Sequence, residues 1–184
     1  MKVRSILHFC LKTQKVIQLI LNKEGKSLVR QFLKAPLRYD RITSGYTNAR
    51  FHPTLGNNMP HKAIDYAASR GTPIRAVGDR TVTYAGWNDG YGRYINIRHN
   101  GTYSTQYAHL SGFAVNNGSQ VSQGDIIGYV GSTGFSTGPH LHYQIKKYGQ
   151  KVNPLEVELP AGDPVPQNKK SDFKKIKREY LNEF

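Results

Sequence analysis

Cysteine is nearly absent from this chain, and long hydrophobic runs are absent altogether. Cys10 is the only cysteine among 184 residues, which excludes an internal disulfide and a metal site built on several thiolates. No stretch approaches the roughly 18 uncharged residues that a membrane-spanning helix needs. The short apolar run Ser5–Leu11 is followed by Lys12 and by no small-residue cleavage site, so it lacks the pattern of a signal peptide.

Acidic residues are also scarce. Twelve Asp and Glu stand against 26 Lys and Arg, which gives a net charge of +14, and residues 1–41 contribute +8 of it. Such an excess favours a polyanionic partner, which could be nucleic acid, anionic lipid or a cell-wall polymer rich in carboxylates and phosphates. Because no helix-turn-helix, paired-cysteine finger or aromatic RNA-binding signature accompanies the basic residues, we expect no nucleic-acid partner.

The length and the apolar content of 38% fit one well-buried domain with attachments. We predict a partial preceding element in residues 1–41, with a short helix at Ser27–Leu33. Residues 42–160 form the predicted main domain. Residues 161–184 form a predicted linker followed by a basic helix over Ser171–Leu181, with its serine as the N-cap. The pattern says nothing about the oligomeric state.

Short β-rich runs punctuated by glycine fill the middle of the chain. They are Thr81–Ala85, Arg93–His99, Tyr103–His109, Ile126–Val130 and Leu141–Lys146. Asn100–Gly101 is typical of a two-residue hairpin turn, and Gly124–Asp125 indicates a second turn. Runs at this spacing predict a mainly β fold with an antiparallel sheet, and we expect no helix between residues 72 and 152.

Several histidines have the spacing of a metal enzyme. In the predicted strand, His140 and His142 are two residues apart, so both imidazoles project from the same face. Alone, such a pair fits two exposed histidines on a wet sheet equally well. His61 and Asp65 add a nitrogen and an oxygen donor within five residues. With His142 they make a three-ligand set, which is usual for a catalytic zinc that keeps one position for water.

Two imidazoles remain beside this set. His109 ends a predicted strand, where on its own it reads equally well as a buried or surface histidine without a catalytic role. Together with His140 it could supply the acid, base or oxyanion-stabilising groups that hydrolysis at zinc requires. The segment Gly131–Pro139 holds three glycines that allow a close backbone approach, as in the wall of a substrate groove. It lacks the phosphate-loop pattern.

These motifs occur in an order that resembles the lysostaphin/LytM-type zinc metallopeptidases, which are murein endopeptidases. The resemblance runs from about Arg41 to Pro160 and rests on these segments: His61–Asp65, Gly71–Pro73, Ala85–Trp87, Gly90–Gly92, Tyr107–Leu110, Gly131–Gly134, Gly138–His142 and Val152–Pro154. It implies a compact antiparallel β domain with a groove, the lysostaphin-type or duplicated hybrid motif.

The resemblance also implies chemistry. One Zn2+ per chain would be bound by His61, Asp65 and His142, with His109 and His140 at the catalytic face, and peptidoglycan stem peptides or cross-links would be the substrate. The segment from Gly25 to Leu37 is similar to what precedes this domain in Gram-negative envelope endopeptidases. That subgroup cuts D-alanyl to diaminopimelyl bonds, so we expect this bond and a location in the cell envelope, in the periplasm or cell wall.

Three residues depart from the family pattern. Ala63 stands where glycine is usual between the first two ligands, and it would be strained if that position needs a positive φ. Arg80 stands where glycine usually follows aspartate in a turn. Gln144 replaces a frequent glutamate near the histidine pair. The alternative function is a non-catalytic member of the same fold that binds the cell wall or activates an amidase.

Overall fold

The structure is a computed structural model. It describes residues 32–33, 35–51, 56–159, 167 and 170–182. The described residues from Leu33 to Glu158 form one compact unit, and helix α1 (Lys170–Asn182) belongs to a separate unit. Most of the short helix predicted at Ser27–Leu33 lies outside the described residues. The division of the chain at residues 41 and 160 stays a prediction.

The compact unit is built from strands. The described residues form β1 (Arg41–Ser44), β2 (Thr47–Phe51), β3 (Asn58–His61), β4 (Ile64–Ala67), β5 (Pro73–Arg75), β6 (Arg80–Asn88), β7 (Gly92–Arg98), β8 (Tyr103–Phe113), β9 (Gln120–Val121), β10 (Ile126–Val130), β11 (His140–Lys147) and β12 (Gln150–Val152). Every strand pairing is antiparallel. The predicted mainly β fold with an antiparallel sheet is confirmed.

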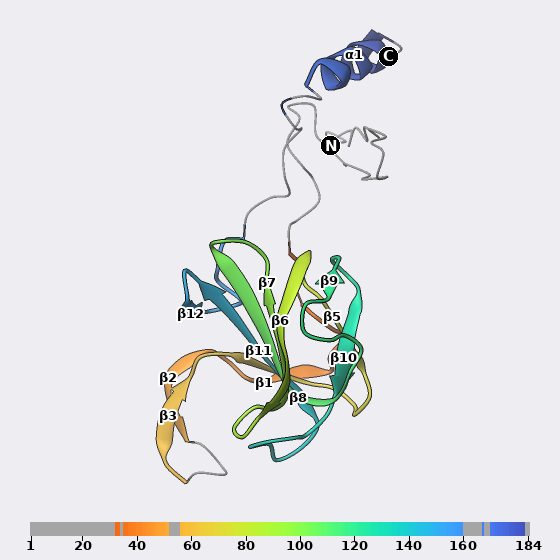
Figure 1. The fold of residues 1–184 in the computed structure, drawn as a ribbon. Helices are drawn as coiled ribbons and strands as arrows, with labels where there is room; N and C mark the ends of the chain where they lie inside the picture. The colour runs from red at the N-terminus through yellow and green to blue at the C-terminus, as the bar shows by residue number, and fades with distance from the viewer. Residues whose placement is uncertain (1–31, 34, 52–55, 160–166, 168–169, 183–184) are drawn as a thin grey trace. The chain divides into compact units, whose positions relative to one another are not determined.

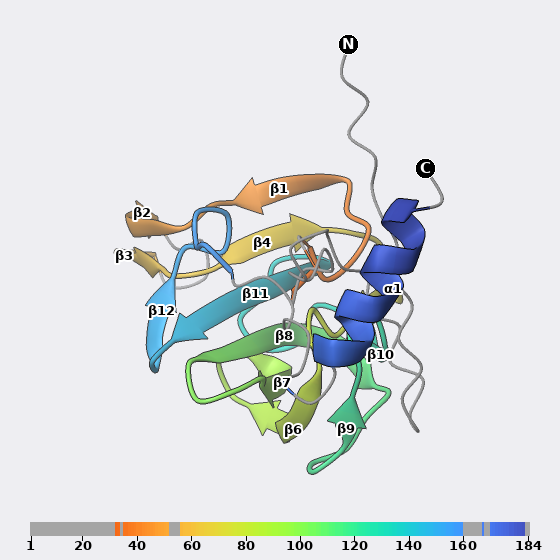
Figure 2. The same cartoon turned by 90° about the horizontal axis from the view of Figure 1, so that it is seen from above.

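One ten-stranded sheet organises the unit. Its main path runs β1-β4-β11-β8-β7-β6-β9, with β10 on β5 and β8 and β12 on β11, and β2 and β3 form a separate hairpin. Figure 2 shows β1, β4, β11, β8, β7 and β6 following one another across the sheet, and Figure 1 shows the β2–β3 hairpin at its side. The long central strands β8 and β11 therefore lie next to each other in the middle.

The alternation of side chains along β11 separates the core from the functional face. Leu141, Tyr143 and Ile145 are almost completely buried, while His140 and His142 between them project from the other face. Each buried aliphatic or aromatic side chain of this size contributes about 1.5–3 kcal/mol through the hydrophobic effect. A slip of one residue in the register would expose this core, so the core fixes which way the two imidazoles point.

The five predicted strands correspond to β6, β7, β8, β10 and β11, and no helix lies between residues 72 and 152, as predicted. The turn at Asn100–Gly101 lies where the sequence predicted it, but it is longer than the predicted two-residue turn. His99 N donates to Tyr103 O at 3.0 Å, and the Asn100 side chain accepts from Thr102 N and Tyr103 N, so a longer loop joins the strands.

Helix α1 matches the predicted C-terminal helix to within one residue at each end. It begins at Lys170, so Ser171 lies inside its first turn and is not the N-cap that the sequence predicted. Among the described residues, the helix that forms is too short and too polar to cross a membrane.

Arg80, at the start of β6, has a φ of 121°, a backbone conformation that side chains with a Cβ rarely adopt. The turn at this departure from the family pattern is therefore strained. We expect Arg80→Gly to raise the free energy of unfolding by about 1 kcal/mol, because relief of strain outweighs the greater entropy of glycine in the unfolded chain. Urea unfolding measures this. Thr81→Gly, at the next residue, should destabilise the protein, and a loss of stability in Arg80→Gly would contradict the strain.

Candidate metal centre and catalytic groove

Three side chains converge at one point of the large sheet. His61 ends β3, Asp65 lies in β4, and His142 is the direct partner of Asp65 in the β4–β11 register. His61 Nε2 lies 3.1 Å from Asp65 Oδ1 and 3.3 Å from His142 Nδ1. The third distance, from His142 Nδ1 to Asp65 Oδ1, is 2.8 Å. We call these three residues the ligand cluster.

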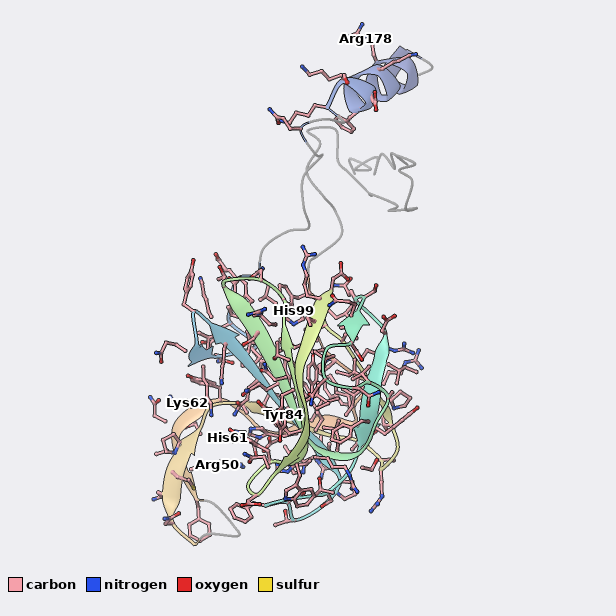
Figure 3. All side chains as sticks on the ribbon, viewed as in Figure 1. Arg50, His61, Lys62, Tyr84, His99 and Arg178 are labelled. Atoms are coloured by element: carbon pink, nitrogen blue, oxygen red, sulfur yellow. The ribbon has the colours of Figure 1, made fainter. Side chains whose placement is uncertain are left out.

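The outer atoms of the ligand cluster are anchored by neighbours. His61 Nδ1 donates to the carbonyl oxygen of Gly45 at 2.8 Å, which leaves its Nε2 lone pair facing the other two residues. Arg50 Nη2 lies 3.4 Å from Asp65 Oδ2. Figure 3 marks His61 and Arg50 between the β2–β3 hairpin and the large sheet. These outer contacts fix which atom of each residue points inward.

Burial and contacts within the ligand cluster set the ionisation states of Asp65 and His142. Burial by itself raises the pKa of Asp65, but the side-chain contacts of its carboxyl with His142 and His61 and the electrostatic effect of the two imidazoles lower it by more. The pKa of this carboxyl is therefore well below its ordinary value. Burial lowers the pKa of His142 against the opposing effect of Asp65, so this imidazole is neutral at pH 7. Ionised carboxylates and neutral imidazoles are the forms that bind metal ions.

The donor set fits a divalent transition metal ion. Ligand atoms placed about 2.0–2.1 Å from a tetrahedral Zn2+ are about 3.3 Å from one another. The three distances in the ligand cluster, from 2.8 to 3.3 Å, are close to that separation. A set of two imidazoles and one carboxylate is the usual composition of a catalytic zinc site with an open fourth position. The cluster could therefore hold a metal ion.

Two further imidazoles lie beside the ligand cluster. The rings of His109 and His140 have centroids 4.7 Å apart, and the His109 ring lies 5.6 Å from that of His142. His109 Nδ1 donates to the carbonyl oxygen of Thr133 at 2.7 Å, and His140 Nδ1 donates to that of Gly138 at 2.8 Å. Each bond fixes the proton on Nδ1, so each ring presents the lone pair of Nε2.

His109 has an unusual backbone for a histidine. Its φ is 62°, in the left-handed region, and its amide donates to Tyr91 O at 2.9 Å. This conformation costs about 1–2 kcal/mol in a residue with a Cβ, so the surrounding contacts must hold it in place. Burial, followed by the effect of the nearby His140, lowers the pKa of His109 to about 4. This ring is therefore neutral at pH 7.

The loop between β10 and β11 is tied to the strands that it faces. The Thr133 hydroxyl accepts from Arg93 N and donates to Leu110 O, both at 2.9 Å. Phe135 N donates to Gly90 O at 2.9 Å, which joins this loop to the β6–β7 turn. Contacts with β7 and β8 therefore fix Thr133, and the carbonyl of Thr133 in turn fixes the orientation of the His109 imidazole.

Comparison with known proteins identifies the family. Residues 59–154, just over half of the chain, match the sequence profile of peptidase family M23, and they include the ligand cluster and both flanking imidazoles. The chain belongs to peptidase family M23. The predicted resemblance to lysostaphin/LytM-type peptidases is thereby confirmed.

Relatives of this M23 peptidase domain include enzymes named as endopeptidases. The chain is 40% identical over 152 residues to the peptidoglycan DD-endopeptidase ShyC of Vibrio cholerae, covering 83% of this chain and 35% of the relative. It is 47% identical over 142 residues to the DD-carboxypeptidase/endopeptidase Mpg of Neisseria meningitidis, and the match covers 76% of this chain and 33% of the relative. The chain therefore spans about a third of the length of these relatives.

Solved structures share the fold of the M23 domain. A zinc-containing peptidase from Vibrio cholerae superposes with a TM-score of 0.67 at 35% identity, covering 78% of this chain and 45% of that one. The catalytic domain of lysostaphin from Staphylococcus simulans superposes with a TM-score of 0.57 at 33% identity, and the match covers 62% of this chain and 89% of that one. The second comparison confirms the lysostaphin-type fold that the sequence predicted.

Two of the departures from the M23 pattern are accommodated locally. Ala63 is completely buried and does not have a positive φ, so the strain considered for it does not arise. The Gln144 carboxamide lies 2.9 Å from His142 Nε2 and 3.3 Å from the Tyr91 hydroxyl. The structure turns Gln144 Nε2 to the ring and leaves Gln144 Oε1 without a partner among the residues that it describes. Because Nδ1 of His142 faces the ligand cluster, its Nε2 carries the proton, so exchanging the two carboxamide atoms, which have the same shape, makes Gln144 the acceptor. Gln144 thus fills the outer position without a charge.

The M23 groove contains all five predicted site residues and several that the sequence did not single out. The groove has a volume of about 690 Å³, and the walls include the ligand cluster, His109 and His140. Arg50, Tyr91 and Lys151 also line it but were given no role, because each reaches the site through contacts between distant parts of the chain. Only one sequence feature pointed to Tyr91: it lies in Gly90–Gly92, one of the segments on which the family resemblance rests.

Gly134 allows the β10–β11 loop to pack against the β6–β7 turn. It has a φ of 71°, and a Cβ built there would lie 2.6 Å from Gly90 O and still closer to Gly92 N. We expect Gly134→Ala to lower the free energy of unfolding by about 2–4 kcal/mol, because overpacking and backbone strain add. Thermal unfolding measures this, with Gly138→Ala as the control, since Gly138 has open space around it. Equal stability of the two variants would contradict the role of Gly134.

Proposed function

We propose that this M23 domain is a zinc-dependent endopeptidase that hydrolyses peptide cross-links of bacterial peptidoglycan, at D-alanyl to diaminopimelyl bonds. The observation that carries the proposal is the convergence of His61 Nε2, Asp65 Oδ1 and His142 Nδ1 beside two anchored imidazoles. The relatives named as peptidoglycan DD-endopeptidases support the substrate, and the zinc-containing peptidase of the same fold supports the metal.

His61, Asp65 and His142 are the proposed ligands of one Zn2+ per chain. A bound zinc ion supplies Lewis acidity and lowers the pKa of its water to about 7. The protein contributes the orientation of the three donors, through Gly45 and Arg50, and keeps the carboxylate ionised. A zinc ion held by three protein ligands would keep one coordination position for water or substrate.

His109 and His140 are the proposed catalytic residues. Both hold their Nδ1 proton on a backbone carbonyl, so Nε2 is the atom that meets the reacting groups. An Nε2 that is unprotonated accepts a proton from the attacking water. Once protonated, the same nitrogen donates to the tetrahedral oxyanion or returns the proton to the leaving amine.

The proposed substrate places the protein in the cell envelope, in the periplasm or cell wall. The net charge of +14 suits a wall polymer that carries many carboxylates. This location is inferred from the substrate alone.

Removal of zinc tests the function directly. We expect the purified full chain to contain one zinc ion per molecule and to release soluble peptide-linked fragments from isolated sacculi. A chelator should abolish the release, and added Zn2+ should restore it, because the reacting water depends on the metal. Mass spectrometry of the released fragments identifies the bond that is cut. Binding to sacculi without any release would instead favour the non-catalytic alternative.

A further inference from the structure

The charges that line the groove are unbalanced. Among the described residues of its walls, Asp65 is the only acid, and its carboxylate is already shared by two imidazoles and Arg50. The basic residues of the walls are Arg50, Lys62 and Lys151. A bound divalent cation adds further positive charge. A groove with this composition favours a substrate that carries negative charge close to the cut bond.

Lys151 is a basic residue of the walls with unused hydrogen-bonding capacity. Its ammonium donates to the Tyr91 hydroxyl at 3.1 Å and lies 5.8 Å from the centre of that ring. No carboxylate of the described part of the chain forms an ion pair with it. An ammonium has three N–H donors, so two of them are available to a ligand in the groove. Arg50 is engaged by Asp65, and the hydrogen bond of Lys62 to the side chain of Asn48 is exposed, whereas that of Lys151 is partly buried.

The position of Lys151 is fixed by its neighbours. Strand β12 pairs with β11 so that Lys151 lies opposite Lys146, and the Tyr46 hydroxyl donates to Lys151 O at 3.0 Å. Lys151 is half-buried, and the hydrogen bond to the Tyr91 hydroxyl holds its ammonium beside that ring. A charge that is partly desolvated and held in place binds an anion more strongly than a mobile surface lysine does.

Lys151 is also close to the reacting centre. The Tyr91 ring that carries it lies 5.6 Å from the ring of His142. Gln144 Nε2 lies 2.9 Å from His142 Nε2 and 3.3 Å from the Tyr91 hydroxyl, which lies 3.1 Å from the Lys151 ammonium. These three steps span no more than about 9 Å, the length of two to three extended peptide residues. A group on the residue next to the cut bond can reach this ammonium.

We propose that Lys151 is a specificity-determining residue that binds a carboxylate on the substrate residue adjacent to the cut bond. The inference rests on the proposed endopeptidase function. In a D-alanyl to diaminopimelyl cross-link, the carbon that bears the cleaved nitrogen also bears a carboxylate, and this is the group that we assign to Lys151. The Tyr91 hydroxyl positions the ammonium, and the carboxylate accepts from its remaining N–H groups.

A matched pair of synthetic cross-linked peptide dimers tests the inference. The two dimers are identical, except that this diaminopimelyl carboxylate is free in one and a carboxamide in the other. We expect the zinc-loaded full chain to prefer the free acid by about 10-fold in kcat/KM, mainly through KM, as for a charge-assisted hydrogen bond. Lys151→Met should lose the preference, and Lys151→Arg should retain most of it.

Lys147 provides the control. It lies 5.9 Å over the ring of Tyr103 on the same hairpin and does not line the groove, so Lys147→Met removes an equivalent lysine–tyrosine pair. This variant should keep the full preference for the free acid. If Lys151→Met loses activity equally on both dimers, Lys151 acts through Tyr91 and not on the carboxylate, and the inference is overturned. Equal cleavage of both dimers by the unaltered chain overturns it too.

Calorimetric binding of both dimers separates this inference from the function on which it rests. If the zinc-loaded chain cleaves neither dimer, the endopeptidase function fails. Tighter binding of the free acid, lost in Lys151→Met, would still support the carboxylate site in that case. Equal binding of the two dimers would overturn it.

Discussion

Replacing His142 with alanine should abolish both zinc binding and peptidoglycan hydrolysis. His142 is the residue that both Asp65 and His61 approach, and its Nδ1 is within 3.3 Å of both partners. Without it, two donors remain, too few for a tight zinc site. We expect kcat/KM on sacculi or cross-linked peptides to fall on the order of 10³-fold or more, because the metal-dependent step is lost. Zinc content and fragment release measure the two effects.

Two controls separate loss of metal from loss of the fold. His142→Cys offers a thiolate, which binds zinc well, so this variant should regain zinc even if its activity stays low. His99→Gln removes a buried imidazole at the β7–β8 turn, away from the groove, and should retain one zinc per chain. If His142→Ala keeps stoichiometric zinc and full activity, the ligand cluster is not the metal site of this protein.

The sheet could be predicted because its long strands have regular patterns. The run that became β11 alternates large apolar residues with histidines, and that alternation gives both the strand and the common direction of His140 and His142. Strands β1 to β5, β9 and β12 were missed because they have only two to five residues each. In strands that short, pairing with neighbours decides the conformation more than the local pattern does.

The ligand cluster could not be predicted from the spacing of residues along the chain alone. Nothing within the segment from His61 to Asp65 indicates that Asp65 pairs with His142, 77 residues further along the chain. That pairing followed from the family resemblance, and the β4–β11 register supplies its physical cause. The contacts of Arg50 and Lys151 could not be predicted from the sequence, because they depend on where the β2–β3 hairpin and β12 lie relative to the central strands.

Removing the imidazole of His109 should stop catalysis while zinc stays bound. His109 is not part of the ligand cluster, and its ring meets the site from the β8 side, next to His140. The φ of 62° constrains the choice of substitution. Asparagine tolerates the left-handed region better than other residues with a Cβ except aspartate, so His109→Asn removes the ring with little backbone strain. We expect kcat to fall about 10²- to 10⁴-fold, the range for loss of a general acid or base.

Zinc content, thermal unfolding and kcat should be measured together in this variant. Tyr148→Asn is the control for the backbone, because Tyr148 also has a positive φ, of 49°, but its side chain is exposed and far from the groove lining. It should leave all three quantities unchanged. Full activity of His109→Asn with zinc bound would contradict the catalytic role proposed for this residue.

The pairing of His109 with His140 gives the same experiment a second test. Both rings present Nε2 and lie 4.7 Å apart, so under the proposed function both would act on the same reacting groups. His140→Gln should therefore lose activity to a similar extent, again with zinc retained. Residues that act as a unit show strongly non-additive effects, so the double variant should be little worse than either single one. Losses that multiply would mean that the two imidazoles serve independent steps.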